Sequence, residues 1–325
     1  MVFGDIGGQR EPGWDPHAGY GSILRLRPDD TLEAILPTGR NGLGMVMHPR
    51  RAPASFTGYE GWILYVGQGI PGHLGAHRPH VVYALGPDMP VPEPFAVLPK
   101  AGRIGDGIPG AVIIGGFAPD HSPYAGSYFC QSLMNCTIYR IFPDGAVIPF
   151  MVLDEPVWST RIMPHWMFWA GPGWGALEGE MIVSGTEGLA FTDPAPENHD
   201  AGFWRIIDDK TIEPIEVPSR TAGFARAEVA PPSFGPFAGQ LFWADMGTTN
   251  LNHSRRVTEP LPFHSSILRL DETGTPQVFA SQLQDGYTQT IFAGGRMLVS
   301  SLRRSYSTGE YHEPDGSIYE IRWTE

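Results

Sequence analysis

Six copies of a short strand pattern recur along the chain and limit its fold more than any other feature. Each copy has an apolar third residue: Ile23, Val82, Ile138, Phe203, Ile267 and Ile318. The separations between these residues are 59, 56, 65, 64 and 51 positions. Strand repeats of this length, with turns such as Pro143-Asp-Gly145 between them, are typical of propeller blades. The sequence therefore predicts an all-β fold, a six-bladed β-propeller formed by one domain over residues 1–325.

A second strand pattern precedes each copy, with bulky residues that end in small ones. It is found at Met1–Gly7, Ile63–Gly69, Val112–Gly116, Met181–Gly185, Leu241–Gly247 and Met297–Ser301. We expect these segments to be second strands and the six copies to be third strands of mostly four-stranded antiparallel blades. Innermost strands are expected at 42–48, 107–112, 164–170, 223–229 and 288–293. Outer strands are expected at 32–36, 95–98, 147–153, 212–217 and 276–280.

The charge balance limits the partners of this protein. The 325 residues carry a formal net charge of −13 and are 42% hydrophobic. Such a chain has a large core and no basic footprint, so we expect no nucleic acid and no membrane as partner. The pattern assigns no oligomeric state. The chain would be cytoplasmic if Met1 is its native start and secreted if a signal segment preceded it. Cys130 and Cys136 lie in one expected loop, where they would bridge, bind a metal or stay free.

Histidines gather in the long connections expected between second and third strands. Most of the 11 histidines lie there, His121, His199 and His253 among them. In a propeller these connections and the links between blades open on one face, around the mouth of the central channel, where we place the functional site. Imidazole groups there would supply an acid–base group or a metal ligand, although loop histidines are often merely solvated.

The links between blades bring further polar residues toward the channel axis. Asn41, Asp106, His165 and Asp285 occupy corresponding places, and Arg40, Arg103, Arg161 and Arg220 precede such places in four links. Oxygen ligands converging on one axis would bind Ca²⁺ or another divalent ion. The competing interpretation is that Asn-Gly and Asp-Gly pairs are only turn formers. The arginines would neutralise the carboxylates or hold an anionic substrate.

Aromatic residues are dense around His165. Trp166 is the best candidate for the wall of a substrate pocket, and Tyr287 and His253 are further substrate-binding candidates, although most such rings belong to blade cores. The stretch Gly67–Gly72 matches a dinucleotide pattern, but a proline-containing loop follows it where a helix is required. We therefore expect a small-molecule substrate and no nucleotide cofactor.

The stretch Ala230–Asp245 and the six strand units resemble the six-bladed propellers of the gluconolactonase and senescence-marker, paraoxonase and strictosidine-synthase-like families. The resemblance covers the whole chain as architecture. It implies a lactonase-like hydrolase with Ca²⁺ in the channel, and by position Asn41, Asp106 and Asp285 would be the ligands. The glutamate that those lactonases place near the first inner strand has no counterpart in this chain.

These observations predict an enzyme that acts on a small, partly apolar molecule. The first hypothesis is hydrolysis of a lactone-like ester, assisted by a divalent metal, in which a histidine moves the proton, His165 first and His121 or His199 as further candidates. Arg161 is a catalytic candidate of another kind, which would orient the substrate beside His165 and Trp166 in the alternative reaction. The first alternative is a metal-independent lyase, isomerase or cyclase of secondary metabolism. The second is a propeller that binds a ligand or protein without catalysis.

Overall fold

Antiparallel strands make up almost all of the structure, which is a computed structural model. It describes residues 2–5, 22–27, 29, 31–36, 45–68, 81–89, 92–102, 112–132, 135–153, 162–171, 173–187, 201–215, 226–245, 265–270, 276–283, 286–293, 295–302 and 317–322. The chain divides into two compact units, Met1–Ser159 and Thr160–Glu325. No helix in the described part is long and apolar enough to cross a bilayer.

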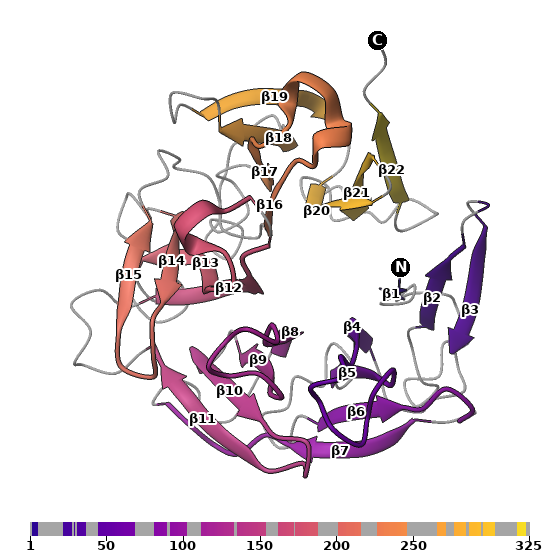
Figure 1. Cartoon of the computed structure of the whole chain (residues 1–325), viewed down its shortest axis with the longest axis vertical. Coiled ribbons are helices and arrows are strands. Elements are labelled where there is room, and N and C mark those ends of the chain that lie inside the picture. The colour runs from indigo at the N-terminus through magenta and orange to yellow at the C-terminus, as the bar shows by residue number, and fades with distance from the viewer. Residues whose placement is uncertain are drawn as a thin grey trace, which may run out of the picture. The chain divides into compact units, whose positions relative to one another are not determined.

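The first unit contains three sheets, whose strands follow one another in chain order (Figure 1). The first sheet has β1 (Val2–Asp5), β2 (Ser22–Leu26) and β3 (Leu32–Leu36). The second has β4 (Met45–Arg51), β5 (Ile63–Gln68), β6 (Val81–Leu85) and β7 (Glu93–Val97). The third has β8 (Val112–Phe117), β9 (Tyr128–Ser132), β10 (Thr137–Ile141) and β11 (Val147–Val152).

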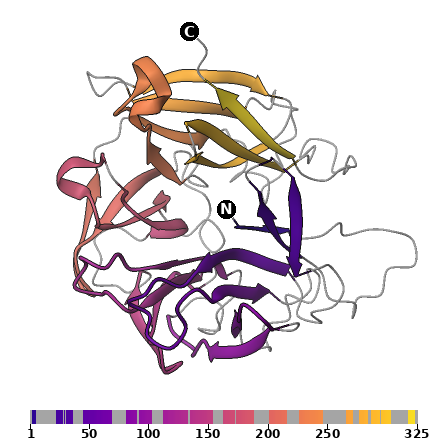
Figure 2. The same ribbon diagram turned by 45° about the vertical axis from the view of Figure 1, so that its right-hand side comes forward.

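The second unit repeats this design, as the turned view also shows (Figure 2). Its first sheet has β12 (Ile162–Trp169), β13 (Met181–Glu187), β14 (Ala201–Ile206) and β15 (Ile212–Ile215). The next has β16 (Ala227–Val229), β17 (Leu241–Asp245), β18 (Ser265–Leu270) and β19 (Pro276–Leu283). The last has β20 (Gly286–Ala293), β21 (Arg296–Leu302) and β22 (Ser317–Arg322).

All six copies of the sequence repeat form the strands that we predicted to be third strands. They are β2, β6, β10, β14, β18 and β22. The register confirms the prediction of a second strand within Met1–Gly7, because Asp5 pairs with Ser22 as Asp245 pairs with Ser266. β1 also lies against β4, the innermost strand of the next sheet, as β17 lies against β20.

The prediction for the third sheet was wrong by one strand. Val112–Phe117 is its innermost strand, and the second strand, Tyr128–Ser132, was not predicted. The Gly115-Gly116 ending resembles that of a second strand, but Gly115 has another cause. A Cβ atom at Gly115 would lie 1.5 Å from the Tyr128 hydroxyl, so the glycine makes room for the tyrosine of the paired strand. Cys130 therefore lies within β9, and both cysteines are buried and form no disulfide.

Four loops between first and second strands share one structure, which the sequence analysis missed. Each starts at an alanine whose N–H donates to the carbonyl of the residue before the second strand. The four bonds are Ala52 to Trp62 (2.7 Å), Ala118 to Ser127 (3.0 Å), Ala170 to Glu180 (2.9 Å) and Ala230 to Gln240 (2.9 Å). A glycine with positive φ directly precedes the last residue: Gly61, Gly126, Gly179 and Gly239. Only glycine adopts this conformation without strain.

Apolar side chains between neighbouring sheets form the core of each unit. In the first unit, Phe56, Val66 and Tyr128 belong to one cluster from the second and third sheets. In the second unit, Phe234, Phe242 and Met297 belong to a cluster from the last two sheets. Phe56 and Phe234 come from equivalent loops and are fully buried. The loops therefore contribute aromatic rings to the core, which orders them and fixes the ends of the innermost strands.

Candidate active site on the innermost strands

His165 occupies a β-bulge in the innermost strand β12. Pro164 pairs with Gly185 and Trp166 pairs with Ser184, so His165 is the extra residue between two consecutive partners on β13. A bulge leaves one residue outside the regular pairing and re-aims side chains, and bulges are common beside active sites. The backbone therefore separates His165, our first catalytic candidate, from the regular alternation of the strand.

Bulges of the same kind recur in other innermost strands. In β8 the extra residue is Ile113, and in β20 it is Thr288. In β4 the pairing shifts by one residue between Met47 and Arg50. The strand predicted over 164–170 does not allow for such a shift, because an apolar pattern contains no direct sign of an inserted residue. A bulge is thus a shared feature of the strands β4, β8, β12 and β20.

A charged pair links the innermost strands β16 and β20 of the second unit. The Arg226 Nη2 atom lies 2.7 Å from the Glu228 Oε1 atom. The other carboxylate oxygen of Glu228 accepts a hydrogen bond of 2.9 Å from the Phe292 N–H, and the Thr290 hydroxyl donates to the Arg226 carbonyl at 3.4 Å. Both charged side chains are about three-quarters buried or more, at 26% and 20% exposure. Glu228 therefore fixes the guanidinium of Arg226, the residue before the innermost strand β16.

Arg226 has one buried donor without a partner among the described residues. Its Nε–H is buried and has no hydrogen-bond acceptor in the structure, within the described part of the chain. A buried donor without a partner is costly, and such groups are often explained by a ligand, water or ion. Arg226 is thus suited to donate to a carbonyl or carboxylate oxygen.

In the first unit, the charge of Arg50 on β4 acts on Tyr128 on β9 of the next sheet. Burial raises the pKa of Tyr128 far above its ordinary value, and the positive charge of Arg50 on β4 opposes this shift only weakly. Tyr128 therefore stays protonated at every physiological pH. It is fully buried, so it fills space over Gly115 and does not act as an acid or base.

The structure describes few of the site residues that the sequence predicted. Trp166 is buried, with 4% exposure. Tyr287 lies in β20, next to the Thr288 bulge. Eight predicted residues lie outside the described part of the chain: Arg40, Asn41, Asp106, Arg161, His199, Arg220, His253 and Asp285.

His121 lies in a different kind of connection from the one predicted. We expected it between a second and a third strand, but it is exposed in the loop from β8 to β9, between a first and a second strand. The error follows from the missed strand β9. The signal that would have corrected it is local: Ala118-Pro119 and Gly126 match Ala230-Pro231 and Gly239 of the equivalent loop.

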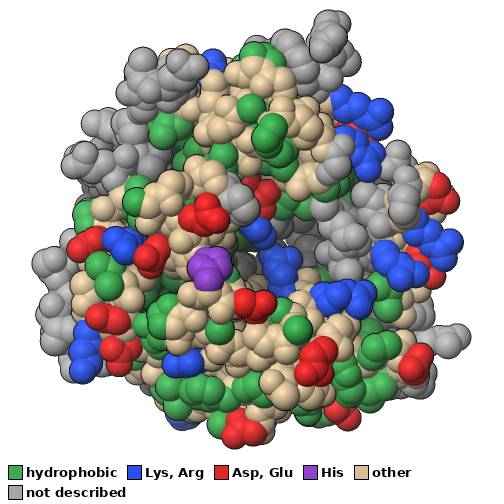
Figure 3. Space-filling view, in the orientation of Figure 1, with side chains coloured by type: hydrophobic (Ala, Val, Ile, Leu, Met, Phe, Trp, Pro, Cys, Tyr) green, Lys and Arg blue, Asp and Glu red, His purple; other side chains and the backbone are tan. Residues whose placement is uncertain are grey.

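Sequence reasoning also missed Arg226 and Glu228. Both residues lie within the expected inner strand 223–229. Two charged residues within three positions do not fit a purely apolar strand. Among the described residues, no group of three His, Cys, Asp or Glu side chains is placed to hold a metal ion. Figure 3 shows charged side chains of both signs interspersed among the described residues of one face. That face does not carry a broad basic field among these residues.

The comparisons with known proteins show the fold and nothing finer. No protein-family model matches the sequence, and no curated protein matches it. Among solved structures, an α-L-arabinanase from Penicillium chrysogenum, in complex with arabinobiose, is similar with a TM-score of 0.59 and 16% identity. The match covers 95% of this chain and 86% of that chain.

Two further structures are less similar. A gluconolactonase from Xanthomonas campestris has a TM-score of 0.47 and 11% identity, over 80% of this chain and 70% of that chain. An inactive variant of virginiamycin B lyase from Staphylococcus aureus, in complex with quinupristin, has a TM-score of 0.42 and 11% identity, over 85% and 84%. The arabinanase match and the antiparallel sheets of mostly four strands identify the fold as an all-β propeller.

Proposed function

We propose that this protein is an enzyme that hydrolyses a lactone-like ester in a small, partly apolar molecule, with its site on the innermost strands of a six-bladed ring. The observation that carries the proposal is the Arg226–Glu228 pair. It is largely buried at an innermost strand, and the Arg226 Nε–H has no acceptor among the described residues. Preorganised donors of this kind stabilise the negative charge that develops on a carbonyl oxygen during ester hydrolysis.

In this proposal the residues have separate roles. Arg226 donates to the substrate carbonyl oxygen, and Glu228 positions Arg226 without contact to the substrate. His165 accepts a proton from the attacking water and then donates it to the leaving ring oxygen. Water adds to the carbonyl carbon, the ring carbon–oxygen bond breaks, and the product is a hydroxy acid that releases one proton at neutral pH. Trp166, Tyr287, Arg40, Arg161, Arg220, His199 and His253 remain candidates for binding the rest of the substrate.

A divalent ion is a further part of the proposal. Asn41, Asp106 and Asp285 would supply oxygen ligands of the kind that Ca²⁺ prefers. When bound, such an ion would polarise the carbonyl group. These three residues lie outside the described part of the chain, so the roles of His165 and Arg226 are argued without the ion.

The test is an assay of hydrolysis with a panel of aliphatic and aromatic lactones and esters. The released acid is measured by the change in pH, and the product is identified by chemical analysis. We expect His165→Gln and Arg226→Met each to lower kcat/KM by about 100-fold or more, as loss of a proton-transfer group or of a carbonyl donor does. His121→Gln is the matched control and keeps full activity. No turnover of any lactone or ester, or unchanged activity in His165→Gln, would contradict the proposal.

Metal dependence separates the proposed reaction from its rivals. We expect bound Ca²⁺ or another divalent ion by elemental analysis, and a loss of lactonase activity after chelation that added metal restores. Full hydrolytic activity without metal would remove the ion from the mechanism. Turnover without net addition of water would favour the lyase or cyclase, and saturable binding of a small molecule without turnover would favour a binding propeller.

A further inference from the structure

The arginine at the fifth place of the repeat usually meets a polar residue across the sheet. In the fourth sheet this residue is Arg205 on β14. Its Nη2 atom lies 2.8 Å from a carboxylate oxygen of Glu180, the residue before β13, and its Nη1 atom lies 3.9 Å from Glu213 on β15. Both terminal nitrogens of Arg205 therefore face carboxylates of the same sheet. This pairing neutralises the guanidinium within the protein.

Arg140 has the same place in β10 but a different environment. The residue before β9 is Ser127, where Glu180 stands in the fourth sheet, and the Arg140 Nε–H donates to the Ser127 hydroxyl at 2.9 Å. The guanidinium carbon lies 4.8 Å from the ring centre of Phe142, 5.1 Å from that of Tyr124 and 6.0 Å from that of Phe129. Three rings and one hydrogen bond thus hold the guanidinium in place.

The terminal nitrogens of Arg140 are available. Neither Nη1 nor Nη2 makes a hydrogen bond or ion pair with any residue of the described segments. The side chain is half-buried, and burial lowers the pKa of Arg140 from its ordinary value. An arginine guanidinium nevertheless stays protonated in proteins. A fixed, charged fork with two open donors matches the two oxygens of a carboxylate.

An exposed apolar side chain borders this fork. Ile148 on β11 pairs directly with Arg140, so both side chains lie on the same face of the sheet. Ile148 is 44% exposed and is one of the few large hydrophobic side chains exposed to this extent in the described residues. The face therefore offers a positive fork beside an apolar contact. An acid with a short apolar group complements both.

We propose that Arg140, fixed by Tyr124, Phe142 and Ser127 and bordered by Ile148, binds the carboxylate of a small organic acid with a short apolar group. The site is separate from the proposed catalytic residues, so it stands or falls independently of the lactonase proposal. The fourth sheet explains the difference: Glu180 fills the fork of Arg205 internally, whereas Ser127 leaves the fork of Arg140 open.

The experiment uses N-acetyl-leucine as probe and its neutral analogue N-acetyl-leucinamide as control. We expect the acid to shift the NMR resonance of the Arg140 Nε–H and to bind with saturation, more weakly at high salt. We expect the amide to bind at least tenfold more weakly. Arg140→Gln removes the fork, and Ser127→Glu keeps Arg140 but supplies an internal carboxylate, as Glu180 does for Arg205. Each should weaken binding of the acid at least tenfold, whereas Arg205→Gln should leave it unchanged.

The Ser127→Glu variant keeps the test informative if Arg140→Gln is unstable, and thermal unfolding of each variant shows which ones are folded. Equal binding of acid and amide, unchanged binding in Ser127→Glu, or no saturable binding of the acid would each overturn the proposal.

Discussion

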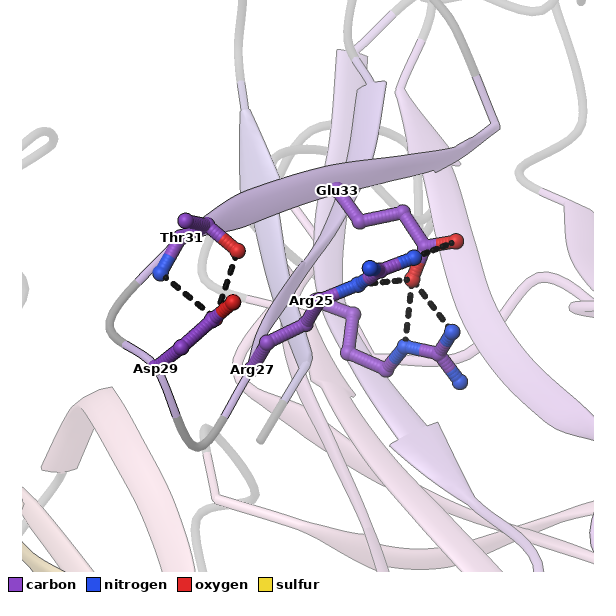
Figure 4. A network of polar contacts seen from close by, with 5 residues as sticks. All are labelled: Arg25, Arg27, Asp29, Thr31 and Glu33. Carbon is purple, nitrogen blue, oxygen red and sulfur yellow. Dashed lines mark hydrogen bonds and ion pairs between the residues drawn. The ribbon is translucent and has the colours of Figure 1, made fainter.

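Glu33 on β3 lies between two arginines of β2 and the following turn, and this position lowers its pKa. Its carboxylate accepts hydrogen bonds from Arg25 Nε at 2.8 Å and Arg27 Nε at 3.1 Å (Figure 4). Hydrogen bonds from Arg27 and then Arg25 lower the pKa of Glu33 to about 2. Asp29, in the same turn, accepts hydrogen bonds from the Thr31 hydroxyl and N–H.

The lowered pKa of Glu33 predicts a specific pH dependence. A carboxyl group whose pKa is lower in the folded protein stabilises the fold above its unfolded pKa and loses this effect as the pH falls. For Glu33 the loss should occur between about pH 4.5 and about pH 2. We expect a carboxyl carbon titration near pH 2 by NMR, which moves toward pH 4 in Arg27→Gln. A midpoint above pH 4 in the wild type would show that the arginines do not hold Glu33 in solution.

Gly115 predicts a steric effect at a single atom. A methyl group at this position would lie 1.5 Å from the Tyr128 hydroxyl and 2.0 Å from its ring. We expect Gly115→Ala to reduce the free energy of unfolding by about 3 kcal/mol or more, as overpacking of a core does. Gly171→Ala is the control, since no atom lies within 4 Å of its added Cβ. Equal urea midpoints for the two variants would contradict the packing seen around Tyr128.

At the scale of elements, the four equivalent loops allow strain to be separated from contact. Gly126 and Gly239 have nearly the same positive φ, 75° and 80°. Alanine at either position costs about 1–2 kcal/mol for the left-handed conformation. A Cβ at residue 126 would also lie 2.9 Å from the Ser55 carbonyl oxygen, whereas one at 239 has no neighbour within 4 Å.

Gly126→Ala should therefore destabilise the protein more than Gly239→Ala, by about 1 kcal/mol. Chemical unfolding of the two variants measures this difference directly. A smaller effect at 126 than at 239 would mean that the two neighbouring loops of the first unit separate easily.

The ion pair of β14 provides a second test at this scale. Arg205 and Glu180 are both about a third exposed, at 30% and 31%. Cross-strand pairs of this kind contribute about 0.2–1 kcal/mol. In a double-mutant cycle of Arg205→Met and Glu180→Gln we expect a coupling energy in this range, which decreases in 1 M salt. A coupling energy of zero at low salt would show that the pair does not contribute to stability.

The sequence predicted some elements well because their signal is local. The third strands carry an apolar residue and a turn at fixed places, so Ile23 and Ile138 locate their strands directly. The strand Tyr128–Ser132 was missed because it is buried throughout and follows a loop that resembles a long connection. The bulge at His165 was not predicted, because it depends on pairing with Gly185 and Ser184, which lie about 20 residues further along the chain.

At the scale of the whole molecule, the net charge of −13 limits association with anionic DNA and anionic membranes. We expect the protein to bind to an anion-exchange resin at pH 7 and not to bind duplex DNA or phosphatidylserine vesicles at 0.15 M salt, since like charges repel. Sedimentation with the vesicles and gel-shift assays with the DNA measure this. Binding to the DNA or to the vesicles would reveal a basic surface outside the described residues.

The candidate active site was less predictable from the sequence than the fold. Six strand copies are enough to indicate a propeller, because each copy reports on its own sheet. A site on innermost strands combines residues from several sheets, and Arg226 and Glu228 gain their meaning only from contact with β20. The closure of the six sheets into one ring, and the mouth of a channel as the site, remain predictions.

The reversed ion pair of the last sheet has a consequence for how the chain finds its fold. In the fourth sheet the third strand carries the arginine, Arg205, and pairs with Glu180; in the last sheet the third strand carries Glu320 and pairs with Arg296. Six similar strands can exchange partners while the chain folds. If β22 took the place of β14, Glu320 would face Glu180, and like charges in opposite positions are unfavourable. The reversed order of charges therefore disfavours pairing of β22 with β13.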